Sequence, residues 1–179
     1  MARVTIDSSA WPVLDRVPLD TLILNAGVMW APYSLTADGY ETQFAVNHLG
    51  HFALVTNLFK KLKAAPGGAR VVTVSSKAHQ YGYAGGVRGL FTEHFAAAIN
   101  DENEYSAGEA YGQSKLCNIL MSSELARRFE GTKVYANAAH PGFVATSLMR
   151  HFPSVVASIA ELLAMVSGIE QREDCTALH

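Results

Sequence analysis

The stretch Arg70-Val71-Val72-Thr73-Val74-Ser75-Ser76 is typical of a buried strand that ends in two hydroxyl side chains. Apolar and polar residues do not alternate along it, which is the pattern of a strand covered on both faces of a sheet. Residues 22–24 and 134–139 have the same form, and they are followed by Asn25-Ala26-Gly27 and by Pro141-Gly142. The sequence therefore predicts three strands of one sheet, each followed by small or polar residues.

Two longer amphipathic stretches separate these strands. Residues 39–63 predict a first helix, which Thr36 or Asp38 could cap, and residues 109–129 predict a second helix that stops before Gly131. The alternation of strands and helices predicts a parallel α/β sheet with right-handed crossover connections. Functional groups in such sheets collect at the carboxyl ends of the strands, so we expect the chemistry of this protein there.

The composition argues against several classes of function. The 179 residues suffice for one domain, and 49% apolar with 17% charged residues fit a globular protein. The net charge is -2, and no basic run is longer than Lys60-Lys61 or Arg127-Arg128, so we expect no nucleic-acid partner. Residues 155–166 are too few to span a bilayer, and residues 1–10 lack a signal-peptide core. We therefore expect a cytoplasmic protein without a membrane segment.

Tyr111 and Lys115 form the first candidate for chemistry. A spacing of four residues places both side chains on one face of the second predicted helix. A free tyrosine has a pKa of about 10, and a neighbouring ammonium lowers that pKa because it favours the phenolate. The pair could then exchange a proton with an alcohol or a carbonyl oxygen. The alternative is an ordinary helix that carries an aromatic residue and a solvated lysine, and the pair alone does not exclude it.

Three further polar side chains are candidates by position. Ser75 and Ser76 follow the central strand, where a hydroxyl can bond a substrate oxygen, although serines also end strands without any such role. Asn47 lies in the middle of the first predicted helix. A buried amide there must find partners, so it could hold a water or a backbone carbonyl, or be a satisfied core residue.

The histidines and cysteines predict no metal site. His48 and His51 have no carboxylate or cysteine at ligand spacing, and we interpret both as structural. Cys117 and Cys175 match neither a metal-binding nor a Cys-x-x-Cys spacing, so two reduced thiols are expected. A serine hydrolase is also disfavoured, since the serines follow Val74 directly and not within a Gly-x-Ser-x-Gly turn.

Five motifs follow one another in an order that resembles the short-chain dehydrogenase/reductase family. They are Leu-Asn-Ala-Gly at 24–27, Val-Asn-His-Leu-Gly-His-Phe at 46–52, Val-Thr-Val-Ser-Ser at 72–76, Tyr-Gly-Gln-Ser-Lys at 111–115 and His-Pro-Gly-Phe-Val-Ala-Thr at 140–146. The resemblance extends over residues 22–150. Residues 47–52, 111–118 and 124–128 are most similar to the retinol-dehydrogenase-like branch.

The resemblance implies a fold and an activity. The implied fold is α/β, an incomplete Rossmann-like doubly wound parallel sheet that lacks the first βαβ unit and the last strand. The implied activity is that of an NAD(P)-dependent oxidoreductase, which transfers a hydride between a nicotinamide cofactor and a small, apolar alcohol or carbonyl substrate. The cofactor would be NAD or NADP, with NADP favoured by the branch.

The resemblance also assigns roles to residues. The catalytic tetrad would be Asn47, Ser76, Tyr111 and Lys115. Tyr111 would be the general acid/base, and Lys115 would lower its pKa and bind the nicotinamide ribose. Ser76 would orient the substrate oxygen, and Asn47 would hold a water in the proton relay. Besides Tyr111 and Lys115, the implied cofactor contacts are Asn25, Ala26 and Gly27 at the adenosine half, and Pro141, Gly142, Val144 and Thr146 at the nicotinamide carboxamide.

The chain departs from the family pattern in two places. Residues 1–20 contain no glycine, so the glycine-rich turn that should hold the cofactor pyrophosphate is not found. We expect residues 1–179 to form one partial domain, with an edge beside residues 22–24 that is open to another copy of the chain. The alternative function is that of a truncated, inactive family member that acts as an interaction module or is a non-functional fragment.

The second departure is the long connection after the central strand. Ser76 and Tyr111 are 35 positions apart, which is more than the family usually has. Residues 77–108 are therefore expected to form an insertion loop on the substrate side, and the four glycines at positions 82, 85, 86 and 89 suggest mobility.

Overall fold

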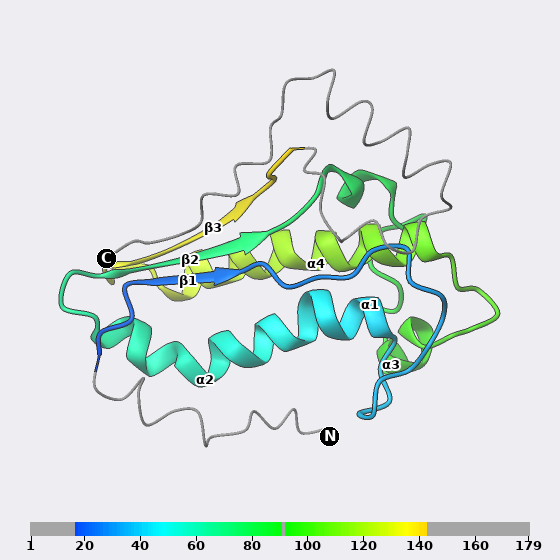
Figure 1. Ribbon diagram of the computed structural model, residues 1–179, viewed down its shortest axis with the longest axis horizontal. Helices are drawn as coiled ribbons and strands as arrows, with labels where there is room; N and C mark the ends of the chain where they lie inside the picture. The colour runs from blue at the N-terminus through cyan, green and yellow to red at the C-terminus, as the bar shows by residue number, and fades with distance from the viewer. Residues whose placement is uncertain (1–16, 91, 143–179) are drawn as a thin grey trace, which may run out of the picture.

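Three parallel strands organise the fold of the computed structural model, which describes residues 17–90 and 92–142. The strands are β1 (Thr21–Leu24), β2 (Ala69–Val74) and β3 (Val134–Ala139), and they lie side by side in that order (Figure 1). Both neighbouring pairs are parallel, with Val71 opposite Leu22 on one side and opposite Ala136 on the other. The parallel sheet and its strand order, both predicted from the sequence, are confirmed.

The first predicted helix begins later than expected. The chain turns between Thr36 and Gly39, where the Gly39 N–H donates to the Thr36 carbonyl at 2.8 Å, and helix α1 (Thr42–Phe44) follows. Its N-cap is Glu41, whose carboxylate accepts from two N–H groups of the helix at 2.7 Å each. The prediction that Thr36 or Asp38 caps this helix was wrong, because both residues belong to the turn that precedes it.

The helical path then changes its pitch. A π-helix, η3 (Ala45–Leu49), continues α1 and leads into α2 (Gly50–Ala64), so the single predicted helix has three parts. π-Helical turns are rare in proteins, and those that do occur are often found at functional sites. The second predicted helix is α4 (Ala107–Arg128), and Gly131 follows its end with a φ of 74°, as the predicted stop requires.

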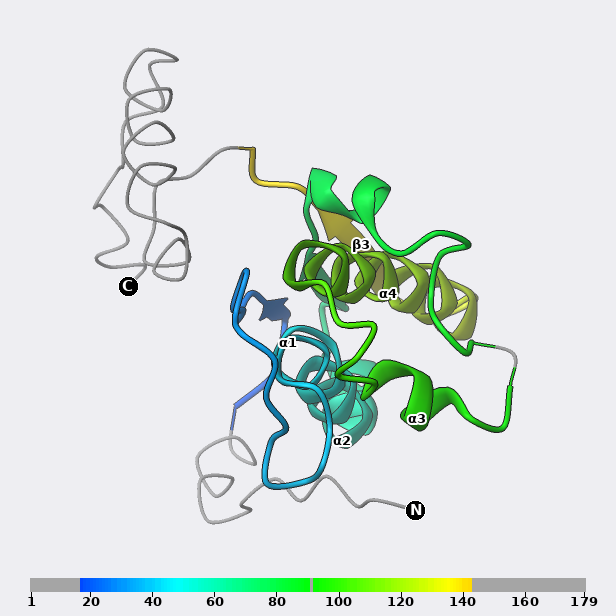
Figure 2. The ribbon, with the colours of Figure 1, turned by 90° about the vertical axis from the view of Figure 1, so that its right-hand side faces the viewer.

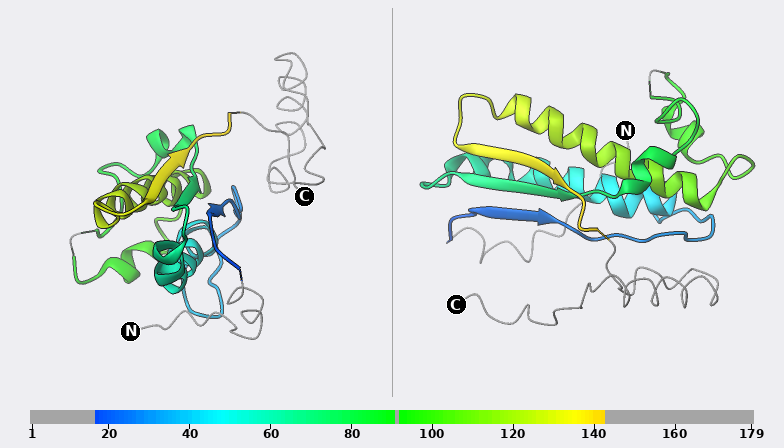
Figure 3. Two further views of the ribbon diagram at one scale, coloured as in Figure 1. Left: turned by 90° about the vertical axis from the view of Figure 1, so that its left-hand side faces the viewer. Right: turned by 90° about the horizontal axis from the view of Figure 1, so that it is seen from above.

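Helices α2 and α4 cover the same face of the sheet (Figures 1 and 3). The core between them is apolar and tightly closed, since Leu24, Leu62, Val71 and Phe129 are at most 1% exposed. The rings of Phe59 and Phe129 stack at a centroid distance of 4.8 Å. Complete burial of such side chains stabilises a fold by about 1.5–3 kcal/mol each.

The opposite face of the sheet differs from what the apolar strand pattern predicted. Ile23 and Tyr135 point away from the helices and are 61% and 58% exposed. Right-handed crossovers in the strand order β1-β2-β3 place both α2 and α4 on one side, which explains why residues 17–90 and 92–142 cover only that side. Burial of both faces is therefore not observed for the described part of the chain.

The connection from β2 to α4 packs against the first helical segment. It contains a 3-10 helix, η4 (Lys77–Tyr81), and the short helix α3 (Phe95–Ile99). Figure 2 shows α3 beside α2 and below α4, and the Phe44 and Phe95 rings meet edge to face at 5.7 Å. Phe44, Ile99 and the free thiol residue Cys117 belong to one small buried cluster, whereas Cys175 lies outside the described residues.

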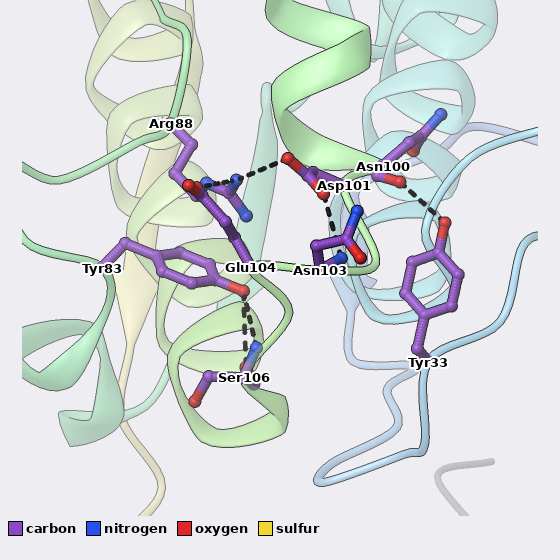
Figure 4. A network of polar contacts seen from close by, with 8 residues as sticks. All are labelled: Tyr33, Tyr83, Arg88, Asn100, Asp101, Asn103, Glu104 and Ser106. Atoms are coloured by element: carbon purple, nitrogen blue, oxygen red, sulfur yellow. Dashed lines mark hydrogen bonds and ion pairs between the residues drawn. The ribbon is translucent and has the colours of Figure 1, made fainter.

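A polar network holds the same connection in place (Figure 4). Arg88 Nη2 lies 2.7 Å from Glu104 Oε2, and the guanidinium of Arg88 lies 4.7 Å from the centre of the Tyr83 ring. The Tyr83 hydroxyl accepts from the N–H of Ser106, the N-cap of α4, at 3.1 Å. The loop is thus tied to the start of α4, while its identity as a substrate-side insertion stays a prediction.

Among the described helices, none has both the length and the apolar character that crossing a membrane requires. Residues 155–166, which the sequence analysis also considered, lie outside the described part.

Candidate active site

The carboxyl ends of the three strands point toward the end of the molecule where α1, η4 and α3 lie (Figure 1). Asn25-Ala26-Gly27 follows β1, Ser75-Ser76 follows β2, and Pro141-Gly142 comes shortly after β3. The N-terminal half of α4 packs beneath this edge. The segments that the sequence singled out therefore converge, as expected for a parallel sheet.

Tyr111 and Lys115 lie together on α4. Each residue is only 4% exposed, and the Lys115 Nζ atom is 5.6 Å from the centre of the Tyr111 ring. The ammonium donates a hydrogen bond to the Val74 carbonyl at 3.1 Å, at the last residue of β2. The predicted spacing thus produces a buried phenol and a buried amine that share one helical face.

The two serines after β2 do different things. The Ser75 hydroxyl is buried and donates to the Lys115 carbonyl at 2.8 Å, so it joins β2 to α4. The Ser76 oxygen accepts from the Ala78 N–H at 3.2 Å at the start of η4, and its side chain also hydrogen-bonds Tyr111. Of the pair, Ser76 is therefore the one whose hydroxyl faces the phenol.

Burial is the main cause of the pKa shifts of Tyr111 and Lys115. It raises the pKa of Tyr111 above its ordinary value, while the hydrogen bond with Ser76 acts in the opposite direction. Burial also lowers the pKa of Lys115 to about 8. The Tyr–Lys spacing led us to expect a lowered tyrosine pKa, and the observed direction is the reverse, because loss of water disfavours the phenolate. Near neutral pH both groups are thus protonated.

Asn47, in η3, uses its whole side-chain amide within the protein. Oδ1 accepts from the Val28 N–H at 2.8 Å, and Nδ2 donates to the Val28 carbonyl at 2.9 Å and to Ser114 Oγ at 2.9 Å. The residue is fully buried. Of the alternatives open from the sequence, the amide holds a backbone segment, namely the loop after β1. The role in holding a water stays a prediction.

Gly27 lies where this loop passes over the site. A Cβ atom there would come within 3.2 Å of Asn47 Oδ1 and 3.7 Å of Lys115 Nζ, so the backbone approaches both closely. Asn25 and Ala26 beside it are exposed, as are Pro141 and Gly142 at the end of β3. The structure thus brings Gly27, Asn47, Ser76, Tyr111 and Lys115 together. Val144 and Thr146, the other expected cofactor contacts, lie outside the described residues.

Sequence reasoning missed a close backbone contact beside Tyr111. A Cβ atom on Gly112 would lie 2.6 Å from the Ala78 carbonyl, and one on Gly82 would lie 3.1 Å from the Gln113 nitrogen. Two glycines therefore let η4 and its C-terminal end lie directly against α4. The only signal in the sequence was the glycine inside the Tyr-Gly-Gln-Ser-Lys motif.

Two histidines border the site. His48 Nδ1 lies 3.1 Å from Asn118 Oδ1, and burial lowers its pKa. Burial, together with the nearby charge of Lys115, lowers the pKa of His51 to about 4. Neither ring nitrogen of His51 has a hydrogen-bond partner among the described residues. Both histidines are thus neutral near neutral pH.

A hollow in the described part of the chain lies elsewhere. It has a volume of about 480 Å³ and is lined by residues at the amino ends of the strands, such as Asp20, Arg70 and Lys133. Tyr111 and Lys115 lie at the opposite, carboxyl ends of the strands, so this hollow is separate from the candidate active site.

Comparison with known proteins supports the family resemblance that the five motifs indicated. A family model for short chain dehydrogenases matches residues 13–88. Human retinol dehydrogenase 12 is 50% identical over 134 residues, which are 74% of this chain and 39% of the relative. The chloroplastic short-chain dehydrogenase TIC 32 A of Brassica napus is 45% identical over 142 residues, 76% of this chain and 42% of the relative. A solved structure of an uncharacterized protein from Mycobacterium paratuberculosis is 40% identical with a TM-score of 0.60, covering 88% of this chain and 54% of that one.

The chain belongs to the short-chain dehydrogenase/reductase family of oxidoreductases. Within that family its sequence lies in the retinol-dehydrogenase-like branch, as the motifs predicted. The Rossmann-like α/β fold is confirmed by the structure from Mycobacterium paratuberculosis, of whose length this chain covers 54%. The chain spans about two fifths of the length of the curated relatives that it matches.

Proposed function

We propose that this chain carries the proton-transfer machinery of an NAD(P)-dependent reaction between a carbonyl compound and the corresponding alcohol, with Tyr111 as the general acid/base. The observation that carries the proposal is the buried Tyr111 phenol, which hydrogen-bonds Ser76 and lies beside the Lys115 ammonium. A pairing of a phenol, a hydroxyl and an ammonium at one strand end suits proton exchange with a substrate oxygen.

The protonation states are those that a carbonyl reduction step requires. A raised pKa keeps Tyr111 in its phenol form, which can donate a proton to a carbonyl oxygen. The Ser76 hydroxyl can donate a hydrogen bond to the same oxygen and so hold it in place. The Lys115 ammonium favours the phenolate that remains after the transfer. These residues would thus act in the reduction of a carbonyl compound in the protonation states that they have near neutral pH, and the oxidation of the alcohol would use the same groups in reverse.

The groups at the strand ends suit the ribose, adenosine and carboxamide parts of a nicotinamide cofactor. Because Gly27 has no side chain, its backbone lies close to Asn47 and Lys115, and Asn25 and Ala26 are exposed beside it. We assign Lys115 and Tyr111 to the ribose, Asn25, Ala26 and Gly27 to the adenosine half, and Pro141, Gly142, Val144 and Thr146 to the carboxamide. The cofactor, when bound, supplies or accepts the hydride. We take NADP over NAD on the strength of the branch resemblance.

The proposed substrate is a small apolar alcohol or carbonyl compound. Retinol, an apolar alcohol, appears in the names of several relatives at 48–50% identity. In residues 77–108, Tyr81 and Leu90 expose apolar surface, being 67% and 44% exposed. Such side chains suit an apolar ligand better than a charged one. A cytoplasmic location also stays a proposal, since one relative is named as chloroplastic.

The experiment is to incubate the 179-residue chain, alone and fused behind a family βαβ unit, with retinaldehyde and NADPH, or NADH, to follow cofactor oxidation, and to compare variants in whichever form turns over. We expect Tyr111→Phe to lower kcat/KM by about 10²–10⁴, the usual contribution of a general acid. The control is Tyr135→Phe, a change at an exposed tyrosine of β3, which should leave the rate within about twofold. Equal rates for wild type and Tyr111→Phe would contradict the proposal.

The alternative, an inactive interaction module, is favoured by one observation: residues 1–20 hold no glycine-rich turn for the cofactor phosphates. Fluorescence titration of NADPH separates the two, with the chain alone and with a family βαβ unit fused before it. Loss of several charge-assisted hydrogen bonds, each about 1.5–3 kcal/mol, should leave the chain alone with weak binding. Binding and turnover that appear only in the fusion favour the enzyme, and their absence from both favours the module.

A further inference from the structure

Trp30 lies in the loop after β1 with a backbone conformation that residues with a side chain rarely adopt. Its φ is 55°, and it is the one residue other than glycine with a positive φ in the described parts of the chain. The large apolar side chain is not buried in exchange, since the residue is 43% exposed. Such a conformation costs stability and persists where the surrounding structure fixes it, often at sites that hold ligands.

Side chains from two other segments hold the loop on both sides of Trp30. The Asn47 amide accepts from the Val28 N–H at 2.8 Å and donates to the Val28 carbonyl at 2.9 Å. The hydroxyl of Tyr105, just before α4, donates to the Ala31 carbonyl at 2.7 Å. The backbone of Trp30 is therefore fixed by its neighbours, and a side chain presented from a fixed backbone is preorganised for binding.

The loop runs along one face of α4, past Tyr111. At one end, a Cβ atom on Gly27 would lie 3.7 Å from Lys115 Nζ. At the other end, a Cβ atom on Gly108 would lie 3.6 Å from two carbons of the Trp30 indole. Tyr111 comes three positions after Gly108 and four before Lys115, so these residues share one face of α4. The indole thus lies about one helical turn from the Tyr111 position, on the side away from Lys115.

This placement gives the surroundings of Tyr111 two sides. We assign the Lys115 side to the ribose of the cofactor, so the body of a substrate whose oxygen meets Tyr111 and Ser76 extends toward the other side. The indole of Trp30 is exposed there. Aromatic rings attract one another in offset-stacked and edge-to-face arrangements, beyond what the burial of apolar area contributes. An indole in this place therefore favours a substrate with a flat π system over a saturated one.

We propose that Trp30 is the specificity-determining contact of this site, and that its indole selects aromatic or conjugated carbonyl compounds over saturated ones of the same size. The proposal rests on the proposed function, because the role of Tyr111 places the reacting oxygen on α4.

The first test compares two aldehydes with the same carbon skeleton, cinnamaldehyde and its saturated counterpart cyclohexylpropanal. Each is reduced with NADPH by the 179-residue chain, alone or fused behind a family βαβ unit. Trp30→Leu should lower kcat/KM about three- to tenfold more for cinnamaldehyde than for cyclohexylpropanal, mainly through KM. Trp30→Phe keeps an aromatic ring and should lose less of this preference. Equal losses with both aldehydes in Trp30→Leu would overturn the proposal.

Trp30→Gly separates this role from a structural one. Glycine adopts a φ of 55° without strain, so the variant keeps the loop conformation while it removes the indole. It should stay folded by circular dichroism and lose the same preference for cinnamaldehyde. Tyr135→Phe, at an exposed position of β3, is the control and should leave the ratio of the two rates within about twofold. A folded Trp30→Gly that still prefers cinnamaldehyde as wild type does would contradict the proposal.

A measurement on the unaltered side chain depends neither on turnover nor on the folding of variants at position 30. The sequence has two tryptophans, so ¹⁵N-labelled protein gives two indole N–H signals, and Trp11→Phe identifies that of Trp30. Cinnamyl alcohol should shift this signal more than cyclohexylpropanol does, because an aromatic ring beside the indole displaces its resonances. A shift that is equal for the two alcohols, or absent in both the chain alone and the fused form, would also overturn the proposal.

These outcomes are separable from the fate of the proposed function. If Tyr111→Phe costs no activity but cinnamyl alcohol still shifts the Trp30 signal selectively, the catalytic assignment fails and the aromatic contact stands. If Tyr111→Phe abolishes activity while Trp30→Leu affects both aldehydes equally, the reverse holds.

Discussion

The two halves of α4 are buried by different means. In the half that begins with Tyr111, the buried side chains are mostly polar, and Lys115 and Asn118 are held by hydrogen bonds to distant segments. In the half that ends the helix, Leu125 and its neighbours pack into the apolar core against α2 and the sheet. Burial of polar groups is costly unless each is paired, whereas apolar burial is favourable. One helix thus carries the proposed chemistry at one end and apolar packing that stabilises the fold at the other.

The largest expected effect tests the apolar half. Phe129→Ala should lower the free energy of unfolding by about 3–5 kcal/mol, because it leaves a cavity beside Phe59 where the two rings stack. Chemical denaturation measures this change. The titration of Lys115 should be unaffected in the variant that remains folded. A change in that titration would contradict the separation of the two halves.

A smaller loss is expected where α4 meets η4. Gly112→Ala would place a methyl group 2.6 Å from the Ala78 carbonyl, so η4 must move and carry Ser76 with it. We expect a loss of about 1–3 kcal/mol in stability, together with a lower rate in the retinaldehyde assay. Gly108→Ala is the control on the same helix. A Cβ there meets only ordinary contacts with Trp30 at 3.6 Å, so stability should hold or rise slightly.

The hydrogen bonds of the polar half can be tested one at a time. The Ser114 hydroxyl accepts a hydrogen bond from Asn47 Nδ2 and donates one to the Tyr111 carbonyl. The side chains of Ser114 and Asn47 are fully buried. Ser114→Ala leaves the Asn47 amide short of a partner and should cost about 1–3 kcal/mol. Ser123→Ala, at an exposed position on α4, should change stability by less than about 0.5 kcal/mol. Equal losses for the two serines would show that the buried network adds no stability.

The next expected effect is a change in how stability varies with pH. Burial lowers the pKa of His51 in the fold to about 4 from an ordinary 6.5, so the unfolded chain binds more protons between these values. Stability should therefore fall as the pH drops from about 6.5 toward 4. His51→Gln, which does not titrate, should flatten that part of the stability profile. Thermal denaturation at several pH values measures it, and an unchanged slope would mean that His51 is not buried and neutral.

The ionisation of Lys115 affects stability in another pH range. Its pKa of about 8 in the fold lies below the ordinary lysine value of about 10.4. The unfolded chain therefore binds more protons between these values, and stability should rise as the pH increases through this range. In Lys115→Met this rise should be absent, and its persistence would show that another group causes it.

Much of the fold could be predicted from local patterns. The strands around Leu22, Val71 and Val134 were visible as apolar runs, and the spacing of four placed Tyr111 and Lys115 on one face. The helix start was predicted wrongly, since Glu41 gains its position as the N-cap from Asn100. The Asn100 amide oxygen accepts from the Glu41 N–H, 59 residues away in the sequence. A local pattern contains no information about such a partner.

The sequence by itself determined the elements, their order and the residue types at the strand ends, because periodicity and turn residues act over a few positions. Only the tertiary structure decided that Asn47 holds Val28, that Ser76 and not Ser75 faces the phenol, and that burial raises the pKa of Tyr111. Partners and burial depend on segments that are tens of residues apart. Their effect on hydrogen bonds and charge exists only once those segments have packed and excluded water.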